Sequence, residues 1–95
     1  MPEQIEVQHN EADSRFETTV TGGVALAVYS LRDGVATFTH TEVPEAAEGQ
    51  GVAGVMVKHA LDHAKREGWK VVPQCSFVKG YIARHPEYEE LVIAG

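Results

Sequence analysis

The sequence predicts an α+β fold, an α/β sandwich in which a mainly antiparallel sheet of about five strands carries one long amphipathic helix and a shorter C-terminal helix. Two observations lead to this class. The first half of the chain alternates like strands divided by turn residues, whereas the second half has a helical period. The 95 residues suffice for one core and not for two, so residues 1–95 are expected to form a single domain.

Two short strands are expected first. Ile5–His9 alternates weakly, and Phe16–Val20 alternates more clearly, with Phe16, Thr18 and Val20 on one side. The sequence Thr21-Gly22-Gly23 then marks a turn.

A long hairpin is expected next. Val24–Leu31 is apolar on both faces, which predicts a central strand covered on two sides. Asp33-Gly34 is a two-residue hairpin signal, so Val35–Glu42 should return antiparallel beside that strand. Pro44 cannot donate a ladder hydrogen bond and should end the pairing.

The second half begins with an amphipathic helix over Val52–Glu67, whose apolar arc comprises Ala53, Met56, Val57, Ala60, Leu61 and Ala64. Gly68 is its expected stop, and Trp69–Val72 is a short strand ended by Pro73. A second helix is expected over about Ser76–Arg84 and breaks at His85-Pro86, because the residue before proline avoids the helical region.

The charge and composition exclude several classes of function. A net charge of −6 argues against a general nucleic-acid binder. Residues 58–84 nevertheless carry +4, which suits a small polyanionic ligand or equally a solvated helix face. Cys75 is the only cysteine and the N-terminus lacks the pattern of a secretory signal, which indicates a cytoplasmic protein. The longest apolar runs, such as Val24–Tyr29, are far too short to span a membrane.

A glycine-rich segment, Glu48-Gly49-Gln50-Gly51-Val52-Ala53-Gly54, joins a predicted strand to the long helix. Glycines permit positive φ and close approach, so amides at a helix N-terminus can face an anion such as a diphosphate. The segment lacks the Gly-Lys-Ser/Thr of a P-loop, and it follows antiparallel strands rather than a Rossmann unit. A glycine-rich helix entrance without a ligand is the alternative.

Several motifs together resemble the GNAT acyl-CoA acyltransferases, whose pyrophosphate loop reads Gln/Arg-x-x-Gly-x-Gly/Ala. Glu48-Gly-Gln-Gly51-Val-Ala53 matches this loop except that Glu48 replaces Gln/Arg. The very short N-acetyltransferases of this superfamily are the most similar branch. The motifs that carry the resemblance are His40-Thr-Glu-Val-Pro44, the glycine-rich segment, Val72-Pro-x-Cys75-x-Phe-Val78 and Tyr81-Ile-x-x-His-Pro-Glu-Tyr88. The resemblance extends from about Ile5 to Leu91.

The resemblance implies that acetyl-CoA lies in an opening between parallel strands at Thr37–Val43 and Trp69–Val72. The backbone at Val43 would pair with pantetheine, the loop amides would bind the diphosphate, and Lys58 or Lys65 would neutralise outlying phosphate. A carboxylate at Glu48 would repel that anion unless it points away. The implied CoA-binding residues are Val43, Gly49, Gln50, Gly51, Val52, Ala53, Gly54 and Lys58.

Four residues are candidates for catalysis. Cys75 could carry the acetyl group or protonate the leaving CoA, although a small buried hydrophobe is the alternative. The resemblance places Tyr81 where many members keep a tyrosine that protonates the CoA sulfur, and packing on the core is its alternative. His40 and Glu42 alternate with Thr41 and share one strand face, where His40 could accept a proton from the amine or merely cap the strand.

One set of residues on the long helix has a spacing that is compatible with a metal site. His59, His63 and Glu67 recur at i, i+4 and i+8, a spacing that can hold a metal, but no further ligand accompanies them in the sequence. We therefore expect no metal, which leaves a metal-binding regulator as a remote rival.

The interpretation is an N-acetyltransferase that moves acetyl from acetyl-CoA to an amine: a protein lysine, a polyamine or a small amine. The short chain leaves little room for an acceptor pocket, and a monomer or weak homodimer is expected. The alternative is a CoA-binding or protein-interaction module that keeps the fold without turnover.

Overall fold

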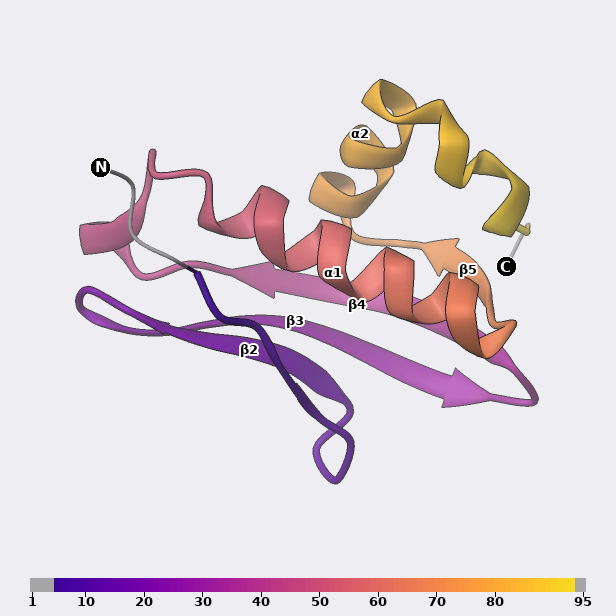
Figure 1. Cartoon of the computed structure of the whole chain (residues 1–95), viewed down its shortest axis with the longest axis horizontal. Coiled ribbons are helices and arrows are strands. Elements are labelled where there is room, and N and C mark those ends of the chain that lie inside the picture. The colour runs from indigo at the N-terminus through magenta and orange to yellow at the C-terminus, as the bar shows by residue number, and fades with distance from the viewer. Residues whose placement is uncertain (1–4, 94–95) are drawn as a thin grey trace.

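The computed structural model describes residues 5–93 and contains one five-stranded sheet with the strands in sequence order. Figure 1 shows the strands side by side with the long helix lying across them. The strands are β1 (Gln8–Asn10), β2 (Arg15–Val20), β3 (Gly23–Arg32), β4 (Val35–Glu42) and β5 (Lys70–Pro73).

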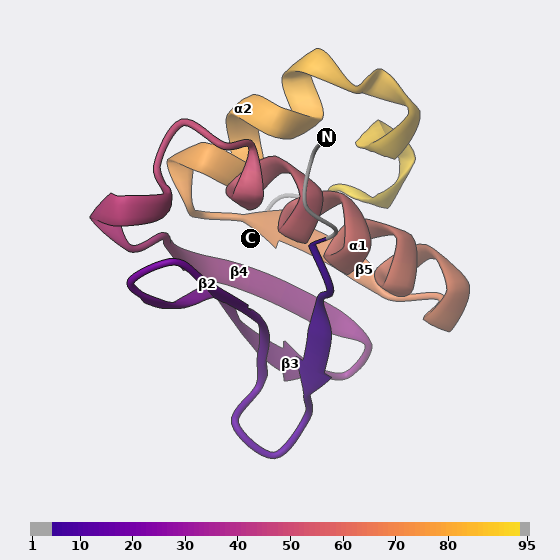
Figure 2. The same ribbon diagram turned by 60° about the vertical axis from the view of Figure 1, so that its left-hand side comes forward.

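Two α-helices and two 3₁₀ helices complete the fold. They are η1 (Glu45–Ala47), α1 (Val52–Glu67), α2 (Ser76–Arg84) and η2 (Pro86–Leu91). Helix α1 covers one face of the sheet, and α2 with η2 packs against α1 near β5 (Figure 2). None of the helices within residues 5–93 has the length and apolar character needed to cross a membrane. The predicted fold class is confirmed, as are the bounds of both α-helices.

The sheet is antiparallel except at its last pair. β4 and β5 run parallel, from Val35 opposite Lys70 to Phe38 opposite Pro73. The α1 crossover makes this parallel pair possible, since parallel strands cannot be joined by a tight turn. β4 continues four residues past Phe38, so its outer edge there has no strand beside it. This free edge of β4 is where the candidate site begins.

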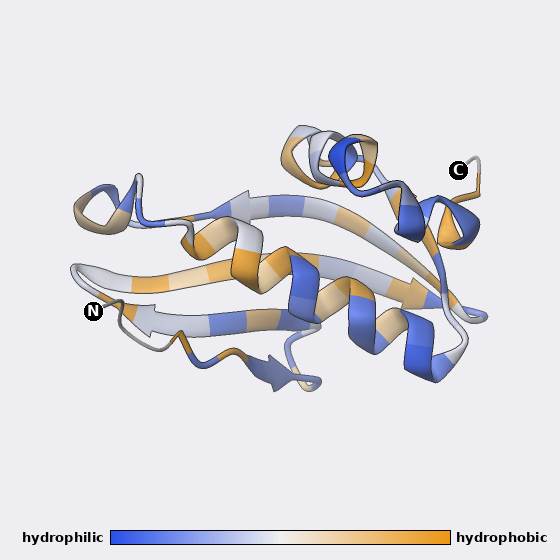
Figure 3. Cartoon of the chain, turned by 45° about the horizontal axis from the view of Figure 1, so that its top comes forward, coloured by the Kyte–Doolittle hydropathy of each residue, from blue (hydrophilic) through white to orange (hydrophobic). Residues whose placement is uncertain are grey.

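The core lies between α1 and one face of the sheet. The helix buries Met56, Val57, Ala60 and Leu61, and its polar residues lie on the outer side, as the blue segments in Figure 3 show. Opposite the helix, β3 offers Ala25, Ala27 and Tyr29, all at or below 5% exposure. Small alanines on the strand let the helix approach closely and exclude water.

The structure corrects the expectation that residues 24–31 are covered on two sides. One side of β3 is buried, but on the other side Val24 is 43% exposed and Leu26 and Val28 are half-buried. The apolar run predicted two covered faces because it lacks polar alternation. In the structure, β3 pairs with a strand on each of its edges but is buried on one face only.

The ends of several elements also differ from the predictions. The first strand is Gln8–Asn10 rather than Ile5–His9, because the tight turn before β2 pairs Asn10 with Arg15. β5 is displaced by one residue and includes Pro73, which is possible because proline sits at its end. The 3₁₀ helices η1 and η2 were not predicted, since such short segments have no apolar period to read.

A β-bulge in β4 decides which side chains face the helix. Tyr29 pairs with Phe38, but Val28 pairs with His40, so Thr39 is an extra residue on β4. An extra residue reverses the alternation beyond it. Phe38 and Thr41 therefore lie on the helix side of the sheet, although an unbroken strand would place them on opposite faces.

Candidate active site

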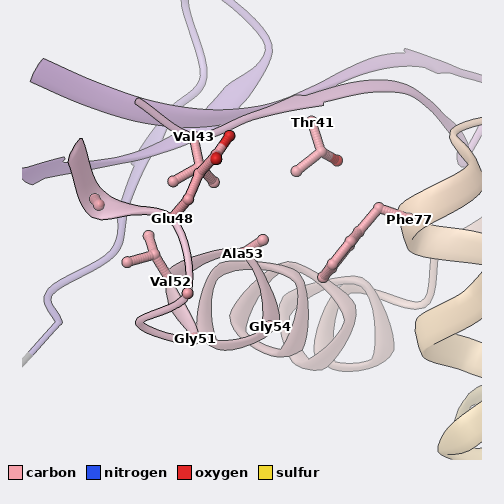
Figure 4. A pocket seen from close by; sticks show the side chains of 10 residues that line it. Thr41, Val43, Glu48, Gly51, Val52, Ala53, Gly54 and Phe77 are labelled. Atoms are coloured by element: carbon pink, nitrogen blue, oxygen red, sulfur yellow. The ribbon is translucent and has the colours of Figure 1, made fainter. Parts of the chain in front are cut away.

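A pocket of about 370 Å³ lies between the free end of β4, the start of α1 and the start of α2. In Figure 4, Thr41 points into it from β4 and Val43 from the segment that follows β4, Ala53 points into it from α1, and Phe77 lies opposite Glu48. The complete lining comprises Thr41, Val43, Ala47, Glu48, Gly49, Gly51, Val52, Ala53, Gly54 and Phe77.

The N-terminus of α1 presents backbone amides to this pocket. Gly49 and Gly51 have φ of 84° and 77°, values that favour glycine, and a Cβ on either would meet no atom within 4 Å. Glycine is thus needed here for its conformation and not for lack of space. The first helical bond runs from the Val55 amide to the Gly51 carbonyl, so the preceding amides have no helical acceptor.

No side chain within residues 5–93 caps α1, and its first turn contains no acidic residue. The free amides and the positive end of the helix dipole are therefore available to an anion. Five of the residues predicted to bind CoA line the pocket together at this point: Gly49, Gly51, Val52, Ala53 and Gly54. Val43, the residue after β4, also lines it.

Two predicted CoA-binding residues lie outside the lining. Gln50 is exposed in the loop between Gly49 and Gly51. Lys58 lies one turn beyond Gly54, where its ammonium group is 2.9 Å from the carboxylate of Asp62. Lys65, the other candidate for neutralising phosphate, lies 3.9 Å from a carboxylate oxygen of Glu90.

Cys75 is held beside the free edge of β4. It is the N-cap of α2, and its amide donates a 2.8 Å hydrogen bond to the carbonyl of Phe38, the last residue of β4 paired with β5. Its Sγ lies 3.2 Å from Oγ1 of Thr41. The half-buried thiol is therefore next to a residue that lines the pocket.

The surroundings of Cys75 favour its thiolate. Burial raises the pKa of the thiol, but the hydroxyl of Thr41 and the backbone amides of Val78 and Phe77 lower it by more. The pKa consequently lies below its ordinary value. A thiol at a helix N-terminus gains this stabilisation because amide dipoles point toward the sulfur.

Tyr81 is buried on α2, one turn after Phe77. Its ring stacks on that of His85, with centroids 4.0 Å apart, and lies beside Gly54 of α1. Burial raises the pKa of its phenol, which keeps the hydroxyl protonated. Tyr81 is absent from the pocket lining, so the structure brings it near the first turns of α1 but not to the pocket surface.

His40 and Glu42 point to the opposite face of the sheet, as the bulge requires. Their side chains are 57% and 61% exposed, and Nε2 of His40 lies 3.3 Å from Oε2 of Glu42. The two residues do share one strand face, as their alternation indicates. That face is turned away from α1 and from the pocket, whereas Thr41 between them faces the pocket.

Three residues of the pocket lining were given no role from the sequence: Thr41, Ala47 and Phe77. Thr41 was not singled out because no local signal announces the bulge that turns it inward. Phe77 belongs to a quoted motif but was given no role, although it forms one wall of the pocket. Glu48 does line the pocket, on the side opposite Phe77 in Figure 4.

The histidines weighed as metal ligands form an aromatic cluster. The rings of His9 and His63 have centroids 4.5 Å apart, and His63 packs edge-on against Trp69 at 5.0 Å. His59 lies near Phe16. Among residues 5–93, no group of three or more His, Cys, Asp or Glu side chains has the arrangement of a metal site.

Comparison with known proteins shows the family and agrees with the fold. Residues 15–91 match the model of the GCN5-related N-acetyl-transferase family. The protein NATD1 of Gallus gallus and that of Mus musculus are each 30% identical over 86 residues, which cover 86% of this chain and 77% of each relative. An NMR structure of a GCN5-like protein from Staphylococcus aureus has the same fold, with a TM-score of 0.72 at 22% identity, covering 95% of this chain and 89% of that one.

Proposed function

This chain belongs to the GCN5-related N-acetyltransferase family, and from that premise we propose that it transfers acetyl from acetyl-CoA to an amine. The observation that carries the proposal is the pocket that extends from the uncapped N-terminus of α1 to Thr41 of β4, whose hydroxyl contacts the thiol of Cys75. The pocket thus offers an anion site at one end and a reactive group near the other.

The diphosphate of CoA would bind at the start of α1. The amides of Val52, Ala53 and Gly54 have no helical acceptor, and the diphosphate oxygens would accept from them. The amide of Gln50 could add to this set from the loop. Lys58 would reach an outlying phosphate only by leaving Asp62, an exposed ion pair that is weak in water.

The pantetheine arm would extend along β4 from Val43 toward Thr41. β5 ends at Pro73, so the backbone of β4 beyond Phe38 offers unpaired groups on that edge. An extended ligand with amide groups can pair with such an edge as an added strand does. This path leads the thioester toward Cys75.

Cys75 supports two routes of acetyl transfer. In the relay, its thiolate bonds to the acetyl carbon, the bond from that carbon to the CoA sulfur breaks, and the amine later displaces the Cys75 thiolate. In direct transfer, the amine attacks the acetyl carbon and the thiol of Cys75 gives its proton to the departing CoA sulfur. Tyr81 is a further proton donor if its hydroxyl reaches that sulfur when CoA is bound.

The acceptor would approach from the face of the sheet opposite α1, because CoA would fill the pocket on the helix side. His40 and Glu42 are exposed on that face. The imidazole of His40 would accept the proton that the attacking ammonium must lose, and Glu42 would orient the imidazole. The acceptor would be a protein lysine, a polyamine or a small amine.

The first experiment tests binding and transfer separately. Calorimetric titration with CoA should show one site, and Gly51→Ala should weaken it because alanine disfavours the positive φ of that position. Gly34→Ala is the matched control, since Gly34 has the same φ of 77° in a hairpin remote from the pocket. Wild-type protein that does not bind CoA would contradict the proposal.

The second experiment identifies the route. The protein is incubated with acetyl-CoA without an acceptor and its intact mass is measured. A gain of about 42 Da on Cys75 that hydroxylamine removes indicates the relay. CoA binding and acetyl transfer without this adduct indicate the direct route. Binding without transfer to any amine would favour the alternative, a CoA-binding module.

A further inference from the structure

Thr41 is the side chain through which β4 contacts the thiol of Cys75. Its Oγ1 lies 3.2 Å from Sγ, and the amide of Cys75 is bonded to Phe38 on the same strand. The start of α2 is therefore joined to β4 at two points, one of them through a side chain. Thr41 is also half-buried and lines the pocket.

The bulge at Thr39 turns the side chain of Thr41 toward the sulfur of Cys75. Without the extra residue, Thr41 would point to the opposite face of the sheet and His40 would occupy its place. A bulge disrupts the ladder and is commonly found where a strand must re-aim a side chain. The result here is a hydroxyl beside a thiol at the edge of the pocket.

We propose that Thr41 is a positioning residue that holds the sulfur of Cys75 at the pocket and stabilises it as a thiolate by donating its hydroxyl proton. The inference rests on the proposed function, in which Cys75 reacts. A hydroxyl suits either form of the sulfur, since it donates to a thiolate and accepts from a thiol. Thr41 can thus keep its contact with Sγ while Cys75 changes its protonation state.

Among the charged side chains of the adjoining segments, Glu48 lines the same pocket as Thr41, on the side opposite Phe77, and the others face elsewhere. His40 and Glu42 of β4 lie on the other side of the sheet, and Lys79 of α2 lines a separate groove with Pro73 and Ile82. The remaining contributions that lower the pKa of Cys75 come from the backbone of Val78, Phe77 and Thr41, which no side-chain substitution removes. Thr41 is therefore the contribution that mutation can isolate.

The test measures the reactivity of the Cys75 thiol in the absence of CoA. The rate of alkylation of Cys75 by iodoacetamide is followed against pH in the wild type, Thr41→Val and Thr41→Ser. Thr41→Val keeps the shape but lacks the hydroxyl, so its alkylation at neutral pH should be roughly tenfold slower, with the midpoint moved to higher pH. Thr41→Ser should restore the wild-type profile.

Thr37→Val is the matched control, because Thr37 lies on the same strand and pairs with Ser30 and Val72 away from Cys75. It should leave the profile unchanged. Circular dichroism and thermal unfolding establish that each variant is folded, and Thr41→Ala supplies a second variant if Thr41→Val is not. A folded Thr41→Val or Thr41→Ala protein that titrates like the wild type would overturn the inference.

Failure of the proposed function can be distinguished from failure of the inference about Thr41. If the wild type does not bind CoA or transfer acetyl, the alkylation profiles still report whether Thr41 controls the thiol. If the wild type is active, Thr41→Val should lower kcat and Thr41→Ser should recover it. An effect on alkylation with no effect on transfer would remove Cys75 from the reaction and with it the role assigned to Thr41.

Discussion

The hydroxyl of Tyr88 in η2 donates a 2.6 Å hydrogen bond to the carboxylate of Asp62 on α1. Tyr88 is only 4% exposed, and burial followed by the adjacent Asp62 carboxylate raises the pKa of its phenol, so the hydroxyl stays protonated and able to donate. This bond fixes the C-terminal segment against α1. It thereby supports α2, the helix that begins at Cys75 and carries Phe77 and Tyr81.

Removing this hydroxyl should destabilise the fold. Tyr88→Phe keeps the ring but leaves one oxygen of the half-buried Asp62 without its donor, a loss of about 1 kcal/mol in the free energy of unfolding. The expected decrease in Tm is roughly 4–8 °C for a domain of this size. Lys58→Met is the control: it removes the exposed ion pair to the same carboxylate and should change Tm little. Equal decreases in both variants would contradict this assignment.

Glu48 should weaken the binding of CoA. Its carboxylate lines the pocket that would receive the diphosphate, on the side opposite Phe77 (Figure 4). Glu48→Gln removes that charge and should tighten CoA binding by roughly threefold to tenfold at low ionic strength, less at high salt, because exposed charges are screened. Calorimetry at two salt concentrations measures this. Glu45→Gln removes an equal charge from η1 outside the lining and should have a smaller effect.

The histidine cluster should make stability depend on pH. Nε2 of His9 lies 2.5 Å from the hydroxyl of Tyr29, and its ring stacks on Phe16 at 4.2 Å. Burial and then the neighbouring His63 lower the pKa of His9, although Glu11 and Glu67 partly oppose this. Burial also lowers the pKa of His59. Both imidazoles therefore bind protons more weakly in the folded state than in the unfolded one.

The direction of the pH effect follows from this difference. Above about pH 7 both states hold these histidines neutral, and stability is independent of them. As the pH falls through about 6.5, the unfolded chain takes up protons first, so the free energy of unfolding decreases, by up to about 1.4 kcal/mol per pH unit for each proton. Urea unfolding from pH 8 to 5 measures the slope. His9→Gln should flatten it, and a slope equal to that of the wild type would contradict this prediction.

The parts of this fold that could be predicted are those set by local sequence. The bounds of α1 follow from a 3.6-residue apolar period between Gly51 and Gly68, both of which adopt positive φ. The end of α2 follows from Pro86, which forces His85 out of the helical region. The glycine-rich start of α1 could be placed for the same reason, because glycine spacing and helix entry are both local.

The face of β4 that meets the pocket could not be predicted. The bulge at Thr39 arises from how β4 pairs with β3, a tertiary relationship that alternation within one strand does not encode. One extra residue moved Thr41 into the pocket and His40 out of it. The contact between Thr41 and Cys75, 34 residues apart, was hidden for the same reason.

His40 should matter for the chemical step and not for CoA binding. It lies on the exposed face from which the acceptor would approach, outside the lining of the CoA pocket. His40→Gln retains a polar side chain but cannot take up a proton, so kcat/KM for the amine should fall by roughly 10²-fold or more, the usual contribution of a general base. Raising the pH should recover part of the loss, because more of the amine is then already neutral. Steady-state kinetics from pH 6.5 to 9.5, with CoA affinity measured on the same samples, checks this. Unchanged kinetics at neutral pH would mean that the amine loses its proton directly to water, and that the exposed pair of His40 and Glu42 has no part in the reaction.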